Sequence, residues 1–355
     1  MNMLRLALRM RNRGHTIGIY ACSGTPFYEK AQENNFTIEV LTIQQPYIAF
    51  AAARQLGLSL QKQHMQILIF SYAKDNYISS WTKYFFNSHF KLIYLQQMEL
   101  GINKKGLVQT LIYRQLDAWI TPLHVLAKQV LAKTYISAAK VRVIPLGVNT
   151  SLFADPGINK LQARSRLHLP HQAFIAGIIG RIDPDKGQEY LIKAIPLLLK
   201  KDKEVHVLIV GEESRGDTRH YPQFLQKLVQ ELDIEKYVHF RPFTEHTEEA
   251  FAALDIFVMA SRSETYGMVT VEAMASGLPV IGTNTGGTPE LLDCGASGIL
   301  MPPADEYALA DALEKLVTNQ ELRQQLAQSA RQRAIARYDY RVQCDQLDEL
   351  LKLIG

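Results

Sequence analysis

Two glutamates separated by a glycine are the first residues whose types and spacing suit chemistry. Glu264 and Glu272 stand eight positions apart in SETYGMVTVEA (263–273), and Gly267 lies between them. Paired carboxylates serve in proteins as a general acid and base, as parts of a metal site, or as separate ligands for one molecule. The choice among these depends on the element that carries each glutamate.

Residues 268–276 are predicted to form a short helix, because Gly277 and Pro279 follow in the positions of a C-terminal cap and a helix stop. Glu264 then precedes the helix, whereas Glu272 lies about one turn inside it. An acid and a base that act on one bond would both have to lie at that bond. The placement therefore favours contacts with different parts of one ligand, and exposure of both side chains to solvent is the alternative.

The start of this helix is predicted to bind an anion. Gly267, Met268 and Val269 would present backbone N–H groups without partners inside the helix, at the positive end of its dipole. A glycine here also lets a ligand approach the backbone closely. A phosphate group fits this arrangement.

A second stretch, IIGRIDPDKGQEY (178–190), places two cations just after a predicted strand. Arg181 offers a planar fork and Lys186 a compact charge, and both suit a phosphate group. Asp183 and Asp185 form a DxD pattern that also occurs in metal sites. The neighbouring cations would compete with a metal ion, so we favour helix capping by these aspartates.

A third stretch, IGTNTGGTPELL (281–292), carries the turn Gly286-Gly287 between a predicted strand and a helix that starts near Pro289. Such a turn can also direct backbone N–H groups toward a ligand. A pair of glycines is weak evidence alone. Together with the other two stretches, it gives three strand ends in one region that all present groups suited to an anion.

Short β-rich apolar segments alternate with longer amphipathic ones along most of the chain. The expected strands lie at 16–21, 36–43, 65–72, 91–98, 117–121, 140–145, 174–180, 205–211, 237–240, 255–260 and 278–283. Expected helices include 47–62, 123–133 and 188–201. This order predicts an α/β protein of two doubly wound, Rossmann-like domains that face each other across a cleft, with a hinge near 147–157.

Length and composition agree with two globular domains. The chain has 355 residues, of which 47% are hydrophobic and 21% charged. Its three cysteines are scattered, which favours a reducing compartment and no zinc site. Residues 1–150 hold 17 Lys and Arg against 6 Asp and Glu, a net +11, whereas 151–355 hold 22 against 29, a net −7. The two halves are therefore expected to meet different partners.

The expected location is cytoplasmic. No apolar run is long enough to cross a bilayer, and no compact basic tract interleaved with aromatics suggests nucleic acid. The basic half could contact an anionic membrane surface or an anionic substrate, and dispersed solvated lysines are an equally good explanation. The aromatic residues between Trp81 and Phe90 are explained best by a helix packed on its sheet, with contact to lipid or acceptor as the alternative.

Taken together, these stretches resemble the retaining, nucleotide-sugar-dependent glycosyltransferases of the GT-B fold, specifically glycosyltransferase family 4. The matching pieces are RGH (13–15), IPLGVNTSLF (144–153), GRIDPDKG (180–187), SRSETYGMVTVEAMASGLPVIGTNTGGTPELL (261–292) and a helical tail (331–355). The resemblance implies an acceptor-side domain over 1–150, a nucleotide-sugar domain over 151–335, and a C-terminal helix over 336–355 that crosses back to the first domain.

The resemblance also implies roles for individual residues. Arg181 and Lys186 would hold the donor diphosphate and stabilise the leaving group, in place of a metal. Glu272 would bind the ribose, and Glu264 would lie near the transferred sugar and matter for catalysis. The N–H groups of Gly267, Met268 and Val269 would hold phosphate oxygens, and Phe243 is placed near the base. No metal or cofactor is expected.

The activity implied is transfer of a sugar from a nucleotide diphosphate sugar to a hydroxyl of a glycan or lipid-linked glycan, with retention, as in lipopolysaccharide, exopolysaccharide or glycolipid synthesis. Two departures favour an alternative. The usual first strand and Gly-rich loop are not present before the RGH helix, and Gln96 and Gln97 stand where many members carry a histidine. The alternative is a truncated or impaired relative that binds nucleotide sugar or acts as an assembly partner. A nicotinamide-dependent oxidoreductase is disfavoured because no G-x-G-x-x-G follows a strand.

Overall fold

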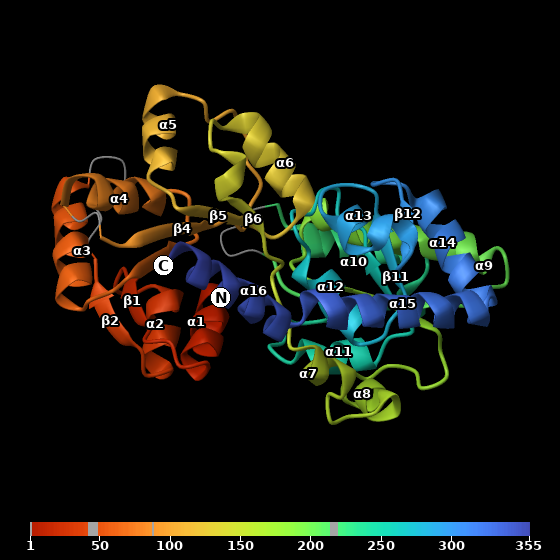
Figure 1. Ribbon diagram of the computed structural model, residues 1–355. Coiled ribbons are helices and arrows are strands. Elements are labelled where there is room, and N and C mark those ends of the chain that lie inside the picture. The colour runs from red at the N-terminus through yellow and green to blue at the C-terminus, as the bar shows by residue number, and fades with distance from the viewer. Residues whose placement is uncertain (1, 42–48, 87–88, 214–218) are drawn as a thin grey trace. The chain divides into compact units, whose positions relative to one another are not determined.

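The computed structural model describes residues 2–41, 49–86, 89–213 and 219–355. The chain divides into two compact units, one of residues 1–146 with 341–355, and one of residues 147–340 (Figure 1). The units change at 146/147 and 340/341, a few residues from the expected divisions at 150/151 and 335/336. Residues 42–43 of an expected strand and 47–48 of an expected helix lie outside the described residues.

Unit 1 alternates helices and strands as the sequence predicts. Its helices are α1 (Asn2–Asn12), α2 (Pro26–Glu33), α3 (Phe50–Lys62), α4 (Asp75–Trp81), α5 (Leu107–Arg114), α6 (His124–Lys133) and α16 (Tyr340–Ile354), with a π-helical turn η2 (Thr82–Phe86) after α4 and a 3-10 turn η3 (Ala138–Lys140). Its strands are β1 (Gly18–Ala21), β2 (Thr37–Val40), β3 (Ile67–Phe70), β4 (Lys91–Leu95), β5 (Ala118–Thr121) and β6 (Val141–Val143).

Among the described residues, the strands of unit 1 form two separate parallel sheets. β1 pairs with β2, and β3, β4, β5 and β6 pair in that order. Within the described residues, β1 and β3 each have a hydrogen-bonded neighbour on one side only. The side chains of β3 (ILIF) are therefore only partly buried up to Phe70, although a strand this apolar is usually central in a parallel sheet.

The C-terminal helix α16 belongs to unit 1 from Arg341 onward. Arg13 donates to Asp348 at 2.8 Å and to Asp345 at 2.5 Å, and His15 Nε2 lies 2.7 Å from Asp348. The RGH stretch after α1 is thus held by the last helix of the chain.

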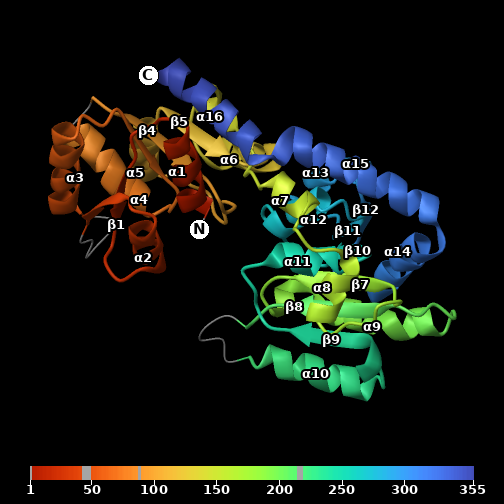
Figure 2. The ribbon, with the colours of Figure 1, turned by 90° about the horizontal axis from the view of Figure 1, so that it is seen from below.

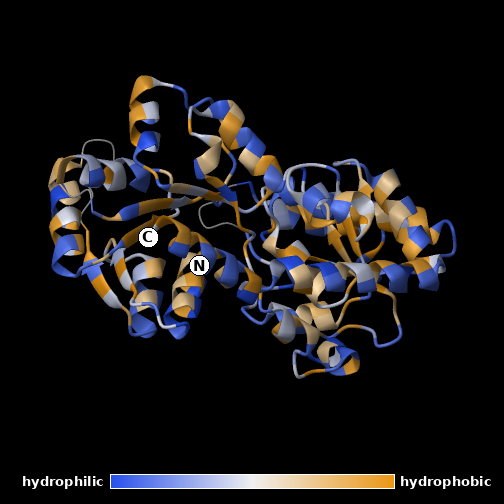
Figure 3. Cartoon of the chain, viewed as in Figure 1, coloured by the Kyte–Doolittle hydropathy of each residue, from blue (hydrophilic) through white to orange (hydrophobic). Residues whose placement is uncertain are grey.

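Unit 2 is one six-stranded parallel sheet in the order β12-β11-β10-β7-β8-β9, with its first strand in the centre. The strands are β7 (Ile175–Ile179), β8 (His206–Val210), β9 (Val238–Arg241), β10 (Ile256–Met259), β11 (Val280–Thr283) and β12 (Ile299–Met301), which was not among the expected strands. β7, β8, β10 and β11 are buried throughout and hydrophobic (Figure 3).

Helices cover both faces of this sheet; α9 packs beside α14, and α12 packs beside α15 (Figure 2). They are α7 (Thr150–Ala154), α8 (Lys160–Arg166), α9 (Gln188–Leu199), α10 (Tyr221–Glu231), α11 (Thr247–Ala252), α12 (Met268–Ala275), α13 (Thr288–Leu291), α14 (Glu306–Thr318) and α15 (Gln320–Tyr338). Short 3-10 turns η4 (Pro184–Lys186), η5 (Glu235–Tyr237) and η6 (Asp293–Gly295) connect them to the strands.

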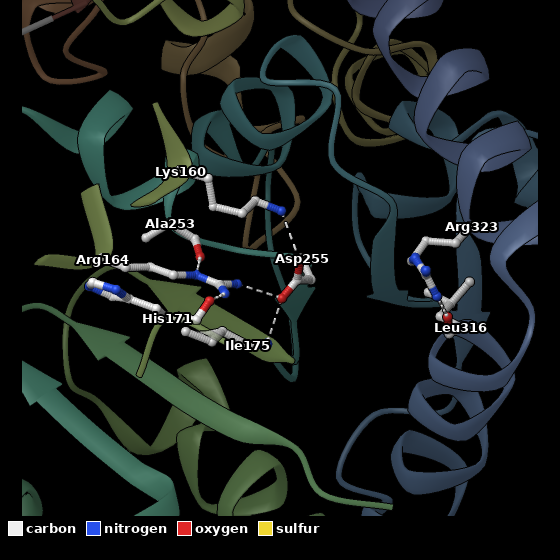
Figure 4. Close-up of polar contacts among 8 residues, drawn as sticks. All are labelled: Lys160, Arg164, His171, Ile175, Ala253, Asp255, Leu316 and Arg323. Atoms are coloured by element: carbon white, nitrogen blue, oxygen red, sulfur yellow. Dashed lines mark hydrogen bonds and ion pairs between the residues drawn. The ribbon is translucent and has the colours of Figure 1, made fainter. Parts of the chain in front are cut away.

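A buried arginine fixes the amino edge of the unit 2 sheet (Figure 4). The guanidinium of Arg164 is almost fully buried and donates to Asp255 at 2.7 Å, to Ala253 O at 3.0 Å and to His171 O at 2.6 Å. Asp255 precedes β10 and also accepts from the N–H of Ile175, the first residue of β7, at 2.8 Å. Because the charge is paired and hydrogen-bonded, this network ties α8 to the amino ends of β7 and β10, opposite the ends that Lys186 and Glu264 follow.

One aromatic expectation is wrong in part. Phe90 is buried and Trp81 half-buried, as a helix packed on a sheet requires, but Tyr84, Phe85 and Phe86 are 53%, 52% and 40% exposed. The reason is the π-helical turn η2, whose wider spacing shifts these residues off the buried side of α4.

A histidine pair at the start of β8 and β9 makes stability depend on pH. His206 Nδ1 lies 3.0 Å from His239 Nε2, and the rings stack. Burial, and then the charges of His206 and Arg241, lower the pKa of His239 to about 4. The unfolded chain takes up this proton near pH 6.5, so the stabilisation is complete above pH 6.5 and is lost as pH falls toward 4.

Between pH 6.5 and pH 4, this histidine should lower the free energy of unfolding by on the order of 2 kcal/mol, after allowance for the ring's partial exposure. We expect His239→Gln to abolish that decrease. Urea unfolding at several pH values measures it. His246→Gln, at an exposed histidine of the same unit, is the control. An unchanged pH slope in the His239 variant would contradict this assignment.

Candidate active site

The helix expected over 268–276 is present as α12 (Met268–Ala275). Gly267 precedes it in the left-handed conformation, with φ 81°, and Gly277 follows it with φ 71°. A side chain is strained at such φ values, so both glycines define where the helix begins and ends. Met268 and Val269 are half-buried in the first turn, and Glu272 is buried in the second.

Gly267 also lies against its neighbours. A Cβ there would come within 3.1 Å of both Glu264 Cγ and Thr270 Oγ1. Thr270 Oγ1 is buried, and no described residue forms a hydrogen bond with it. A buried polar atom without a protein partner beside a helix start is suited to a ligand or water.

Glu264 and Lys186 form an ion pair. Lys186 Nζ lies 2.5 Å from Glu264 Oε2, and the two side chains are 24% and 17% exposed. The lysine follows β7 and the glutamate follows β10, and these strands are neighbours in the sheet. The first and second sequence stretches therefore meet at one charged contact, which spacing alone did not predict.

Close backbone approaches hold the three loops together. A Cβ on Gly187 would lie 2.2 Å from Ala260 O, and one on Gly286 would lie 2.2 Å from Glu264 O. Gly287 N–H donates to Glu264 O at 2.8 Å. Only glycine fits at 187 and 286, so the loops after β7, β10 and β11 pack as one body.

The aspartates near Arg181 are used within the protein. Asp183 accepts from Asp185 N–H at 2.9 Å, which caps η4, and from Arg219 at 2.7 Å. Burial raises the pKa of Asp183, but these hydrogen bonds and the charges of Arg219 and Arg181 outweigh it and lower that pKa overall. Arg181 is exposed at the end of β7, and its carbonyl accepts from Gln188 Nε2 at 2.7 Å.

The region that contains all these loops matches a known family. Residues 159–333 match the family model described as glycosyl transferases group 1. The match identifies a glycosyl transferases group 1 domain over these residues, which are just under half of the chain. The glycosyltransferase domain thus includes α12 and the loops after β7, β10 and β11.

Two curated relatives of the glycosyltransferase domain share one name. A D-inositol 3-phosphate glycosyltransferase of Stackebrandtia nassauensis is 38% identical over 214 residues, which are 59% of this chain and 47% of the relative. A protein of the same name from Corynebacterium jeikeium is 35% identical over 217 residues, covering 59% and 51%. The chain spans about half the length of these relatives.

Solved structures extend the likeness to the whole chain. HepE of Anabaena, solved with UDP, superposes with a TM-score of 0.86 at 22% identity and covers 99% of this chain and 95% of that one. A glycosyltransferase of Rickettsia africae gives 0.88 at 18% identity, covering 99% and 94%. Identities this low show the fold alone. The fold is GT-B, as expected from the sequence.

Outside the glycosyltransferase domain, one of the two glutamines at the usual histidine position is part of the core. Gln96 is fully buried, accepts from Trp119 Nε1 at 2.9 Å and donates to Met98 O at 2.7 Å. Both ends of its amide are occupied by protein groups. Gln97 is half-buried, so of the two it is the one whose side chain a ligand could reach.

Two further residues of the glycosyltransferase domain escaped sequence reasoning. Arg262 N–H donates to Asp185 O at 2.9 Å, and its guanidinium donates to Tyr190 OH at 2.6 Å, which joins the loop after β10 to the one after β7. No spacing signal marks either residue.

Phe243 is 59% exposed after β9, the strand at the sheet's edge, whereas the other candidates follow β7, β10 and β11.

Proposed function

We propose that the chain transfers a sugar from a nucleotide diphosphate sugar to an acceptor hydroxyl, with retention. The observation that carries the proposal is the Lys186–Glu264 ion pair beside the positive start of α12. It puts a cation for a diphosphate and a carboxylate for sugar hydroxyls side by side. The family match of the same residues supports it.

Each part of the donor would bind to different residues of these loops. Glu272, buried on α12, would accept hydrogen bonds from the ribose. The N–H groups of Gly267, Met268 and Val269 would bind phosphate oxygens, with Thr270 Oγ1 available as a further donor. Phe243, which is exposed after the carboxyl end of β9 in the same sheet, would lie near the base.

The chemical step would break the bond between the anomeric carbon and the diphosphate oxygen, and form one from that carbon to the acceptor oxygen. The acceptor proton would pass to the leaving phosphate. Lys186 and Arg181 would stabilise the charge that develops there, so that no metal is needed. Binding of the diphosphate would draw Lys186 from Glu264 and leave that carboxylate to bind sugar hydroxyls.

We propose a hydroxyl of a glycan or lipid-linked glycan as the acceptor, in the cytoplasm and with contact to the inner membrane surface. The net charge of +11 over residues 1–150 supports an anionic partner for this half. In the part of the chain that the structure describes, no helix is long and apolar enough to span a bilayer. The curated relatives are named for inositol 3-phosphate, so this compound belongs among the acceptors tested.

Turnover of UDP- and GDP-sugars, with and without EDTA, tests the proposal directly. Binding is measured separately by calorimetry. Release of UDP or GDP that depends on an acceptor supports transfer, and NMR of the product's anomeric centre tests retention. Tight donor binding without any turnover would instead support a binding-only relative. The structural role of Gln96 and the two separate sheets of unit 1 are the observations that favour that alternative.

Glu272→Ala is expected to weaken donor binding by about 10- to 100-fold, because hydrogen bonds to a charged group contribute about 1.5–3 kcal/mol. Calorimetry with UDP and GDP measures the loss. Glu231→Ala, which breaks an exposed pair on α10, should leave affinity unchanged. If the Glu272 variant binds the donor with full affinity, the ribose lies elsewhere.

A further inference from the structure

Five aromatic side chains form one surface of unit 1, here called the aromatic patch: Phe50, Trp81, Tyr84, Phe85 and Phe86. Trp81 is half-buried, and the other four are 40% to 53% exposed. Side chains this large are seldom left to water in groups, because each exposes apolar area whose burial is favourable. The patch is therefore a candidate interaction surface.

The rings of the patch pack on one another. Phe85 is at the centre, with ring centroids 4.7 Å from Tyr84, 5.5 Å from Trp81, 5.6 Å from Phe50 and 6.2 Å from Phe86. Phe50 and Trp81 lie 5.9 Å apart. Residues from α3, α4 and η2 thus form one continuous surface, not separate exposed side chains.

The backbone holds the patch outward. Thr82 begins the π-helical turn, is fully buried, and donates to Ala53 O at 3.0 Å and Ile78 O at 2.8 Å. The contact with Ala53 O fixes η2 against α3, while the exposed rings of Tyr84, Phe85 and Phe86 face away from the core. π-helical turns are rare and occur often at functional sites.

The helices around the patch are basic. α3 lies beside α4, and α4 beside α5 (Figure 1). These helices and η2 carry Arg54, Lys62, Lys83 and Arg114 against one carboxylate, Asp75, which is half-buried; Lys83, however, is paired with Asp117 beyond them. Arg54 stands one turn after Phe50 on α3 and is exposed. The patch is thus an aromatic surface with an exposed cation, Arg54, beside it.

We propose that the aromatic patch docks unit 1 on an anionic lipid bilayer, with the rings at the level of the headgroups and Arg54 on the phosphates. Trp81 and Tyr84 have polar tips that suit that interface, the three phenylalanines supply apolar area, and Arg54 adds attraction to anionic lipid. This inference names the surface that makes the membrane contact of the proposed function, and it rests on that proposed function.

The chain contains a reporter at the patch. It has two tryptophans, and Trp119 is fully buried in unit 1 while Trp81 packs against Phe85. Titration of the full chain with phosphatidylglycerol vesicles should shift Trp81 emission to the blue, and lipids brominated on the acyl chain should quench it. Phosphatidylcholine vesicles should give at least about tenfold weaker binding. Trp81→Phe should float with the vesicles but lose the signal.

Variants test the patch itself by vesicle flotation. Tyr84→Ser with Phe85→Ser should lower vesicle binding at least about tenfold, because two exposed rings are removed. The matched control, Phe224→Ser with Tyr307→Ser, removes two exposed rings from unit 2 and should bind as the unchanged chain does. Arg54→Glu should lower binding to phosphatidylglycerol, whereas Arg337→Glu in unit 2 should not.

Several outcomes would overturn the inference. One is a full chain that does not float with anionic vesicles, and another is a patch variant that floats as well as its control. A third is a dimer by light scattering that Phe85→Ser dissociates, without vesicle binding, which would assign the patch to a second copy of the chain. UDP-sugar binding by the same variants distinguishes failure of this inference from failure of the proposed function. A lost donor site leaves flotation intact, and a lost patch leaves donor binding intact.

Discussion

Replacing Lys186 with alanine is expected to slow sugar transfer by about 10²- to 10³-fold, or roughly 2.7–4 kcal/mol, as for the loss of one preorganised donor to a developing charge. The lysine contacts Glu264 at 2.5 Å, so its removal also leaves a carboxylate beside the diphosphate. That repulsion should weaken donor binding in addition. Steady-state rates with saturating donor, together with calorimetry, separate the two effects.

Two further variants make the result specific. Lys201→Ala removes an exposed lysine that pairs with Asp311 and Glu314 on the same unit, and it should leave the rate unchanged. Glu264→Gln in the Lys186→Ala background should restore part of the donor affinity, because it removes the uncompensated charge. Full activity in the Lys186→Ala chain would contradict the assigned role of this lysine.

Gly286→Ala is expected to lower the free energy of unfolding by about 3 kcal/mol or more and to abolish donor binding. Gly286 has φ 59°, and a Cβ there would lie 2.2 Å from the carbonyl oxygen of Glu264. The loop after β10 would have to move, and with it the start of α12. Urea unfolding and UDP calorimetry measure the two losses.

The matched control for this substitution is Gly157→Ala. Gly157 has φ 70°, but nothing lies within 4 Å of its Cβ position. This variant should show only the backbone strain, about 1–2 kcal/mol, with donor binding intact. If both variants lose the same stability and both bind UDP, the close approach at Gly286 does not hold the site.

Local signals in the sequence were enough to predict most elements of both units and the start of α12. The helix stop at Gly277 and the glycine before Met268 depend on backbone sterics that act over a few residues. Alternation of short apolar strands with amphipathic helices likewise gave the parallel sheets. β12 was missed because ILM is too short for a period to be recognised.

Contacts between distant segments could not be predicted in this way. Gln96 stands where many members of the family carry a histidine, yet its amide accepts a hydrogen bond from Trp119 inside the core. The pairing of Lys186 with Glu264 joins residues 78 positions apart, and it depends on β7 and β10 being neighbours in the sheet. The exposure of Tyr84 and Phe85 depends on a π-helical turn, for which the sequence carries no clear signal.

Unit 2 is a continuous stretch of chain, whereas unit 1 is closed by residues from both ends. During synthesis, residues 147–340 can therefore fold as soon as they leave the ribosome, while unit 1 waits for α16. The partners of Arg13 and His15, Asp345 and Asp348, are made only after all of unit 2. Unit 1 can therefore be completed only after the whole of unit 2 has been synthesised, and its contacts with α16 form after those within residues 1–146.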